Sequence, residues 1–190
     1  MRIDIDSARV RSVFAELREQ SGFEESRALF EQGRLPVEML QAMALRPDIL
    51  RAFGMMGEGV YPGGLLERAL KEKVILKTSR LNGCQFCVNA HQDIMKNLGL
   101  SQDRIHDLES TRNLTQREAM ALRYAETVTR TYGRVTEEQF AELSTGFSDE
   151  EIVELTFLIG YINMLNMFNN ALEVSYRDDY RDLGAGKGVQ

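Results

Sequence analysis

Proline is confined to the first third of this 190-residue chain, and that distribution restricts the fold more than any other feature. The three prolines are Pro36, Pro47 and Pro62, so the 128 residues that follow position 62 contain none. Proline interrupts an α-helix more strongly than any other residue, because it lacks a backbone N–H and its ring clashes with the preceding turn. We therefore expect the last two thirds of the chain to be nearly all helix.

Helix-start signals recur along the proline-free region. Three pairs match the capping box, in which a Ser or Thr and a Glu or Gln three residues later satisfy free amides at a helix start: Thr115 with Glu118, Thr136 with Gln139, and Ser148 with Glu151. Glycines typical of helix ends fall between the periodic segments, at Gly99, Gly133 and Gly146. These signals predict helices over residues 7–20, 36–46, 47–59, 64–81, 84–98, 101–110, 115–132, 136–145 and 148–174.

The predicted fold class is all-α, with a single domain. The best strand candidate is 74–76, Val-Ile-Leu, but the apolar residues around it recur at helical spacing. A chain of this length with 43% hydrophobic residues can bury one substantial core. We divide it into an N-terminal helical extension (1–39), a main domain (40–174) and a C-terminal tail (175–190).

Charge and hydropathy exclude two classes of partner. The net charge is −6 and no Lys or Arg cluster is present, which argues against a nucleic-acid partner. The longest uninterrupted apolar stretches are too short to span a bilayer, so no membrane partner is expected. The charged N-terminus lacks the apolar core of a signal peptide, which predicts a cytoplasmic protein.

The chain has only two cysteines, Cys84 and Cys87, and they form a CxxC motif that is followed by His91. In a reducing cytoplasm such a motif is typical of a catalytic or metal-binding site. Asn82-Gly83 should end the preceding helix and place Cys84 in the first turn of the next, where the helix dipole favours a thiolate. The motif therefore predicts reactive thiols.

The spacing of the motif predicts its geometry. Positions 84, 87 and 91 lie on one helix face, with the imidazole of His91 adjacent to the sulfur of Cys87. Such a histidine can take the thiol proton, so Cys87 becomes the better nucleophile and Cys84 can close a disulfide with it. A carboxylate or a carbonyl should hold the second ring nitrogen. Glu72 on the preceding helix is one candidate carboxylate, and Glu67 and Asp93 are others.

Glu72, Cys84, Cys87 and His91, separated by eleven, two and three residues, resemble the signature of the alkylhydroperoxidase D-like (AhpD-like) proteins of the carboxymuconolactone decarboxylase superfamily. The flanks KVILKTSRLNGCQFCVNAHQDIMKNLGLSQDRI and AMALRYAETVTRTYGRVTEEQFAELSTGFSDEEIVELTFLIGYINMLNMFNNAL resemble that domain too. The resemblance covers roughly residues 40–174. It implies an all-helical fold that assembles into trimers or hexamers.

The resemblance also implies a thiol peroxidase cycle without a cofactor. Cys87 would attack a hydroperoxide, Cys84 would resolve it as a disulfide, His91 would be the base, and Glu72 would orient His91 or relay protons through it. A dithiol carrier such as a lipoylated protein would be the reductant. One departure is Phe86, because the best-studied members carry a second histidine at that position, so the proton relay is shortened here.

Three alternatives remain open at this point. A zinc site needs four N or S ligands, but the chain offers two Cys, His91 and the distant His106. A lactone decarboxylase, the other activity of the superfamily, would need no cysteine pair. A non-enzymatic redox sensor or oligomeric binding protein would be oxidised once, whereas a peroxidase would turn over.

The segment 151–172 is apolar on most faces and is expected to be a central buried helix or one shared with a neighbouring subunit. Its asparagines Asn163, Asn166 and Asn169 need hydrogen-bond partners there. We interpret them as ties between helices, with ligand binding as the alternative. The methionines ahead of the motif and in this segment are interpreted as core residues that are also able to line a pocket over the thiols.

Overall fold

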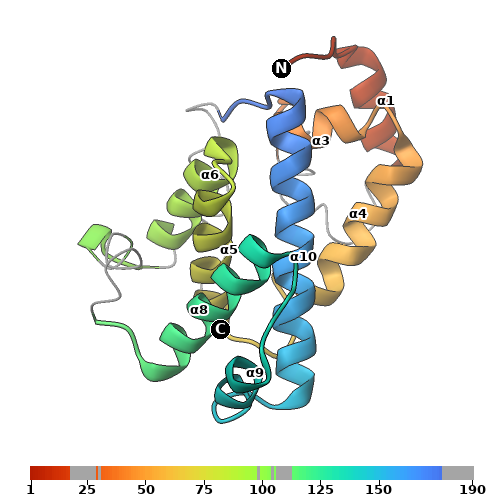
Figure 1. Ribbon diagram of the computed structural model, residues 1–190. Helices are drawn as coiled ribbons and strands as arrows, with labels where there is room; N and C mark the ends of the chain where they lie inside the picture. The colour runs from red at the N-terminus through yellow and green to blue at the C-terminus, as the bar shows by residue number, and fades with distance from the viewer. Residues whose placement is uncertain (18–28, 30, 98, 104, 106–112, 177–190) are drawn as a thin grey trace.

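The computed structural model describes residues 1–17, 29, 31–97, 99–103, 105 and 113–176. Within these ranges the chain forms helices and no strand, so the all-α prediction is confirmed, and the strand candidate 74–76 lies inside a helix. The helices, labelled as in Figure 1, are α1 (Ser7–Leu17), α3 (Glu38–Met43), α4 (Pro47–Val60), α5 (Arg68–Leu81), α6 (Gln85–Asn97), α8 (Gln116–Thr131), α9 (Glu137–Leu143) and α10 (Asp149–Leu172).

The long helix α10 runs through the middle of the molecule, with α5, α6 and α8 to one side of it and α1, α3 and α4 to the other (Figure 1). α5 packs against α6, α8 and α10. Ile75 on α5 and Leu158 and Ile159 on α10 have no exposed surface. Burying each such side chain contributes about 1.5–3 kcal/mol, so this contact anchors the core.

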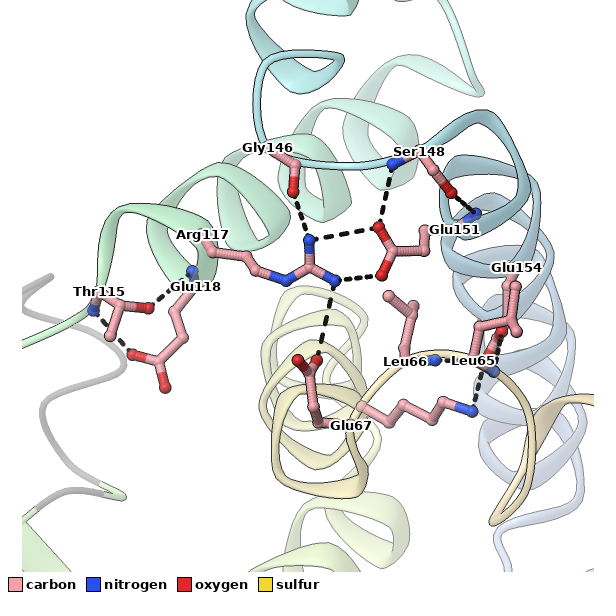
Figure 2. Close-up of polar contacts among 11 residues, drawn as sticks. Leu65, Leu66, Glu67, Thr115, Arg117, Glu118, Gly146, Ser148, Glu151 and Glu154 are labelled. Atoms are coloured by element: carbon pink, nitrogen blue, oxygen red, sulfur yellow. Dashed lines mark hydrogen bonds and ion pairs between the residues drawn. The ribbon is translucent and has the colours of Figure 1, made fainter.

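The helix starts are the part of the fold that the sequence predicts best. All three predicted capping boxes are present, with both of their reciprocal hydrogen bonds, ahead of α8, α9 and α10. Figure 2 shows two of them, at Thr115 and Ser148. The Asn82-Gly83 turn ends α5 as predicted, and Gly83 adopts a φ of 63°, which favours glycine. Most of the predicted helix 101–110 and His106 lie outside the described residues.

Arg117 joins the start of α8 to the start of α10 (Figure 2). Its guanidinium donates to Glu151 at 2.5 Å and to the carbonyl of Gly146, and it lies 4.0 Å from the ring centroid of Phe147. Glu151 also caps the backbone N–H of Ser148. One carboxylate therefore both starts α10 and holds α8 beside it.

The predicted helix 64–81 begins too early, because α5 starts at Arg68. The preceding loop is held by Glu154 of α10, whose carboxylate accepts the amides of Leu65 at 2.5 Å and Leu66 at 3.3 Å (Figure 2). Glu154 also pairs with the fully buried Lys71, which donates to the carbonyl of Val60 at 3.0 Å. Because Glu154 already accepts the amides of Leu65 and Leu66, this segment does not have to be helical to pair them. No local sequence pattern indicates a contact with a residue so distant in the chain.

α10 buries one side and exposes the other. Its exposed apolar residues follow each other at intervals of four, seven and three: Val153, Phe157, Met164 and Met167. Two of these are methionines, and on α4 Met55 and Met56 are exposed as well, so the core interpretation is wrong for these four. Within the described ranges α10 is the one helix long and apolar enough to cross a membrane, but 44% of that window is buried in the protein. Its packing against α5 and α8 is that of a core helix.

Candidate functional site

Cys84 lies immediately before α6, one residue earlier than the predicted first turn. Its carbonyl accepts the amide of Val88 at 3.0 Å, which starts the helix, and its sulfur lies 3.4 Å from the amide nitrogen of Cys87. The thiol of Cys84 thus occupies the position of a helix-capping side chain. An N–H that points at the sulfur favours its thiolate form.

The two thiols are free and lie in direct contact. The distance between the sulfurs of Cys84 and Cys87 is 2.7 Å. The hydrogen bond from Cys87 is the main cause that lowers the pKa of Cys84 to about 7, against the opposing effect of burial. The pKa of Cys87 is raised, first by this bond to Cys84 and then by burial. The first thiolate therefore forms on Cys84.

This order differs from the prediction that His91 would make Cys87 the thiolate. The helix amide and the neighbouring thiol both favour charge on Cys84, whereas the Nδ1 atom of His91 is occupied by Glu72. The two cysteines differ in access in the opposite sense, because Cys84 is 0% exposed and Cys87 is 7% exposed. Charge and access are thus divided between the two sulfurs.

The structure brings Glu72 against His91. The distance from Nδ1 of His91 to Oε2 of Glu72 is 2.6 Å, and the glutamate is completely buried in α5. The other two candidate carboxylates have different partners: Glu67 is exposed near Arg117, and Asp93 accepts the hydroxyl of Tyr176 at 2.8 Å. With Nδ1 held, Nε2 is the ring nitrogen left to exchange a proton with a thiol or a substrate.

Two further residues hold Glu72, and the sequence reasoning missed both. Oε1 of Glu72 accepts Nε of Arg68 at 2.5 Å and the hydroxyl of Tyr61 at 2.6 Å, and Arg68 also donates to that hydroxyl at 2.7 Å. Burial by itself would raise the pKa of Glu72, but His91, Arg68 and Tyr61 together hold it below its ordinary value. The i, i+4 spacing of Arg68 and Glu72 is a signal that could have found the arginine. Tyr61 lies in the loop before α5 and has no such signal.

Three asparagines of α10 divide into two groups. Asn163 and Asn166 both accept the side-chain amide of Asn82, at 2.7 and 2.9 Å, and so tie α10 to the end of α5 as predicted. Asn169 instead directs its amide nitrogen at the sulfur of Cys87, at 3.2 Å. The sulfur of Met39 lies 3.5 Å from the same nitrogen.

An apolar cover closes over the thiols. Phe86 packs edge-on against Tyr176 with ring centroids 5.9 Å apart, and both belong to the cluster that surrounds the cysteines. The rest of this cover comes from segments near the two chain ends: Met1, Val37, Met39, Leu172 and Val174. Phe86 thus supplies packing at the position where a second histidine would extend a proton relay.

The sequence profile of the carboxymuconolactone decarboxylase family matches residues 47–127, which contain Glu72, Cys84, Cys87 and His91. The Agrobacterium tumefaciens protein ATU0492, named as a candidate antioxidant defence protein AhpD, has a similar structure. It is 28% identical with a TM-score of 0.67, over 72% of this chain and 95% of that one. Residues 47–127 therefore match the carboxymuconolactone decarboxylase family, and the described fold is AhpD-like.

Two other proteins are similar to this chain, one in structure and one in sequence. A peroxidase-related protein from Silicibacter sp. TM1040 has a TM-score of 0.76 at 21% identity, over 95% of this chain and 93% of that one, and so shares the fold. The Bacillus subtilis (strain 168) protein YdfG is 26% identical over 111 residues, which is 56% of this chain and 76% of YdfG. The structural similarity thus extends beyond the matched profile.

Zinc binding is the alternative that the CxxC motif left open. Among the described residues, no group of three or more His, Cys, Asp and Glu side chains is arranged to hold a metal ion. His91 uses Nδ1 for Glu72, and the two thiols use each other. The residues of the motif are arranged for proton and thiol chemistry.

The hydrogen bond between the two thiols predicts the pH at which the first thiolate forms. We expect one thiolate to appear with a midpoint near pH 7, because the Cys87 thiol and the helix amide lower the pKa of Cys84 to about 7. In Cys87→Ala the main cause is removed, so the midpoint should move up toward the ordinary thiol value of about 8.5. The measurement is the ultraviolet absorbance of the thiolate during a pH titration. A wild-type midpoint at the ordinary value would contradict this account of the pair.

Proposed function

We propose that the protein is a cysteine-based peroxidase that reduces hydroperoxides through a Cys84–Cys87 disulfide and so has an antioxidant role. The observation that carries the proposal is the pair of free thiols in contact, 2.7 Å apart, beside a histidine held by a buried glutamate. Such a pair can pass two electrons to a peroxide and store the result as a disulfide. The match to the carboxymuconolactone decarboxylase profile and the structural similarity to a peroxidase-related protein support the same chemistry.

The first step of the proposed cycle is attack by Cys87. Cys87 is the more exposed of the two residues, and its proton can pass to the Cys84 thiolate with which it is in contact. The Cys87 sulfur then attacks the terminal oxygen of the hydroperoxide, so that an S–O bond forms and the O–O bond breaks. In this proposal Nε2 of His91 holds the proton that left Cys84 when its thiolate formed. The leaving alkoxide takes this proton and departs as the alcohol, and Glu72 orients the ring for the transfer.

The second step closes the disulfide. The Cys84 sulfur attacks the sulfenic sulfur of Cys87, an S–S bond forms, and the hydroxyl group leaves as water with the thiol proton of Cys84. A dithiol then reduces the disulfide and is itself oxidised to a disulfide. We propose a small or protein-bound dithiol such as a lipoyl group as this reductant, and a reducing compartment such as the cytoplasm as the setting.

The proposal includes assembly of several copies into a homo-oligomer. Support comes from the exposed apolar side chains of α10, which share one face of the helix: Val153, Phe157, Met164 and Met167. An exposed face of this kind on a core helix is typical of a surface that a partner subunit covers. We propose a second copy of this chain as that partner.

One experiment tests the peroxidase cycle. Free thiols are counted in the reduced protein, again after one equivalent of an organic hydroperoxide, and again after addition of dihydrolipoamide. The proposal expects a loss of both thiols, their recovery, and continued peroxide consumption while the dithiol lasts. A single stoichiometric oxidation without turnover would favour the redox sensor. Thiols that do not react would exclude both readings.

A further inference from the structure

We propose that Asn169 is a catalytic residue of the cysteine site, with its amide nitrogen directed at the reacting sulfur and its carbonyl oxygen available to the peroxide. The residue lies near the end of α10 and is 1% exposed. Its nitrogen is 3.2 Å from the sulfur of Cys87. This inference rests on the proposed peroxidase function and deepens it.

The amide nitrogen supplies a donor to the thiolate of Cys87. When the Cys87 proton passes to Cys84, negative charge appears on a sulfur that is almost completely buried. Burial disfavours such a charge, and a hydrogen bond to the charged form offsets this. The bond from Asn169 acts in this sense, since it lowers the pKa of Cys87 against the effects that raise it.

The carbonyl oxygen of the same amide is an acceptor without a partner. Oδ1 of Asn169 is buried and accepts no hydrogen bond from any residue that the structure describes. Buried acceptors of this kind are uncommon because the missing bond costs stability. The terminal O–H of a hydroperoxide that reaches the Cys87 sulfur can donate to this oxygen, as can the O–H of the sulfenic acid that follows. One rigid amide thus offers a donor to the nucleophile and an acceptor to the oxygen it attacks.

The neighbouring asparagines of α10 provide an internal comparison. Asn166 is equally buried, but its oxygen accepts from Asn82 and its nitrogen donates to Ser79 at 3.1 Å. Asn163 has partners for both atoms as well, because it accepts from Asn82 and donates to the carbonyl of Ile159. Both residues therefore have partners for their oxygen and their nitrogen, although Asn166 also lowers the pKa of both thiols. Asn169 differs because its Oδ1 has no partner among the described residues.

In chemical terms Asn169 acts on the first step of the cycle. The S–O bond forms between Cys87 and the terminal peroxide oxygen, the O–O bond breaks, and the alkoxide leaves to be protonated. The hydrogen of the terminal oxygen stays on that oxygen and becomes the sulfenic O–H. Asn169 holds this hydrogen in place and exchanges no proton or electron. The two electrons pass from the Cys87 sulfur, which is oxidised to a sulfenic acid, to the hydroperoxide, which is reduced to an alcohol.

The test uses the full-length chain with Cys84→Ser, in which Cys87 is the only thiol. Its oxidation by cumene hydroperoxide to a sulfenic acid is followed with a sulfenic-acid trapping reagent, and the pKa of Cys87 is measured separately by alkylation. Adding Asn169→Leu removes both polar atoms at similar size. We expect the oxidation rate to fall about 10²-fold, as for the loss of one donor to developing charge, and the thiol pKa to rise.

Two further variants control for poor folding and for nonspecific effects of substitution on α10. Asn169→Asp keeps an acceptor oxygen but removes the donor, so it should slow oxidation even if Asn169→Leu folds poorly. Asn170→Ala is the matched control, because Asn170 is the next residue of α10 and donates to the carbonyl of Asn82. It should oxidise at the parent rate. Circular dichroism checks that each variant is folded.

The outcomes separate this inference from the function on which it rests. Parent-like rates and an unchanged Cys87 pKa in folded Asn169→Leu or Asn169→Asp would overturn the role of Asn169 while the peroxidase stands. If the parent forms no sulfenic acid with the hydroperoxide, the proposed function fails, and the acceptor role fails with it. The donor role is then decided by the thiol pKa alone.

Discussion

Cys87→Ser is expected to reduce hydroperoxide turnover to the uncatalysed background. The hydroxyl of serine is a far weaker nucleophile than a thiol, and no disulfide can form without the second sulfur. Cys84 would keep its thiol but is 0% exposed, so it should not replace Cys87 as the group that meets the peroxide. Turnover is measured as peroxide consumption with dihydrolipoamide in excess.

The matched variant is Cys84→Ser, which separates attack from resolution. It should react with one equivalent of hydroperoxide and then stall, because Cys87 sulfenic acid has no thiol partner. Mass spectrometry should find one added oxygen on Cys87 in this variant and none in Cys87→Ser. If Cys87→Ser retained turnover, or if the added oxygen were found on Cys84, the order of attack would be wrong. An added oxygen on Cys84 is the competing outcome, because the pKa of Cys84 is lowered to about 7.

Glu72→Gln is expected to impair both activity and stability. The carboxylate is fully buried and balances the charge of Arg68, whose side chain is only partly exposed. Removing one partner of a buried ion pair costs about 3–5 kcal/mol, since the remaining charge is left uncompensated. His91 also loses the group that orients its ring, so turnover should fall by a factor approaching the 10²–10⁴ or so that one acid–base group supplies. The measurements are denaturant unfolding and steady-state peroxide consumption.

Glu67→Gln is the matched control for Glu72→Gln. Glu67 lies five residues earlier, directly before α5, and its nearest cation is Arg117 at 3.8 Å. Its side chain is 67% exposed, so the same substitution should change the unfolding free energy by no more than about 0.5 kcal/mol. Equal losses in the two variants would mean that burial and the contact with His91 contribute nothing particular to Glu72. A Glu72→Gln protein with normal stability but no turnover would assign Glu72 to proton transfer alone.

The features that the sequence predicts correctly are local. A capping box is written within four residues, and the Asn82-Gly83 turn within two, so their structures depend little on the rest of the chain. The Glu72–His91 contact spans 19 residues and was expected as one of three possible pairs. Only the packing of α5 on α6 selects Glu72 from the three candidate carboxylates.

The features that the sequence did not predict depend on contacts between distant segments. Glu154 shapes the loop before α5 from about 89 positions away, and Asn169 reaches Cys87 from 82 positions away. The pKa shifts of the two thiols differ from the prediction that His91 makes Cys87 the thiolate, and the reason is again physical. Helical spacing places His91 near Cys87 on the same face, but it does not say which nitrogen is free or that Cys84 caps the helix.

The α5 side of the site and the apolar cover over the thiols differ in the free energy needed to displace them. On α5, the neighbouring residues Lys71 and Glu72 hold the loop before the helix through Val60 and Tyr61, with buried charges that are costly to separate. The cover formed by residues near the two chain ends is held by the exposed pair Arg2–Glu173, which contributes about 0–1 kcal/mol, and by hydrogen bonds from Ser175 to Glu38 and from Tyr176 to Asp93. We therefore expect this cover to move more readily than α5 and to expose the sulfurs on its side.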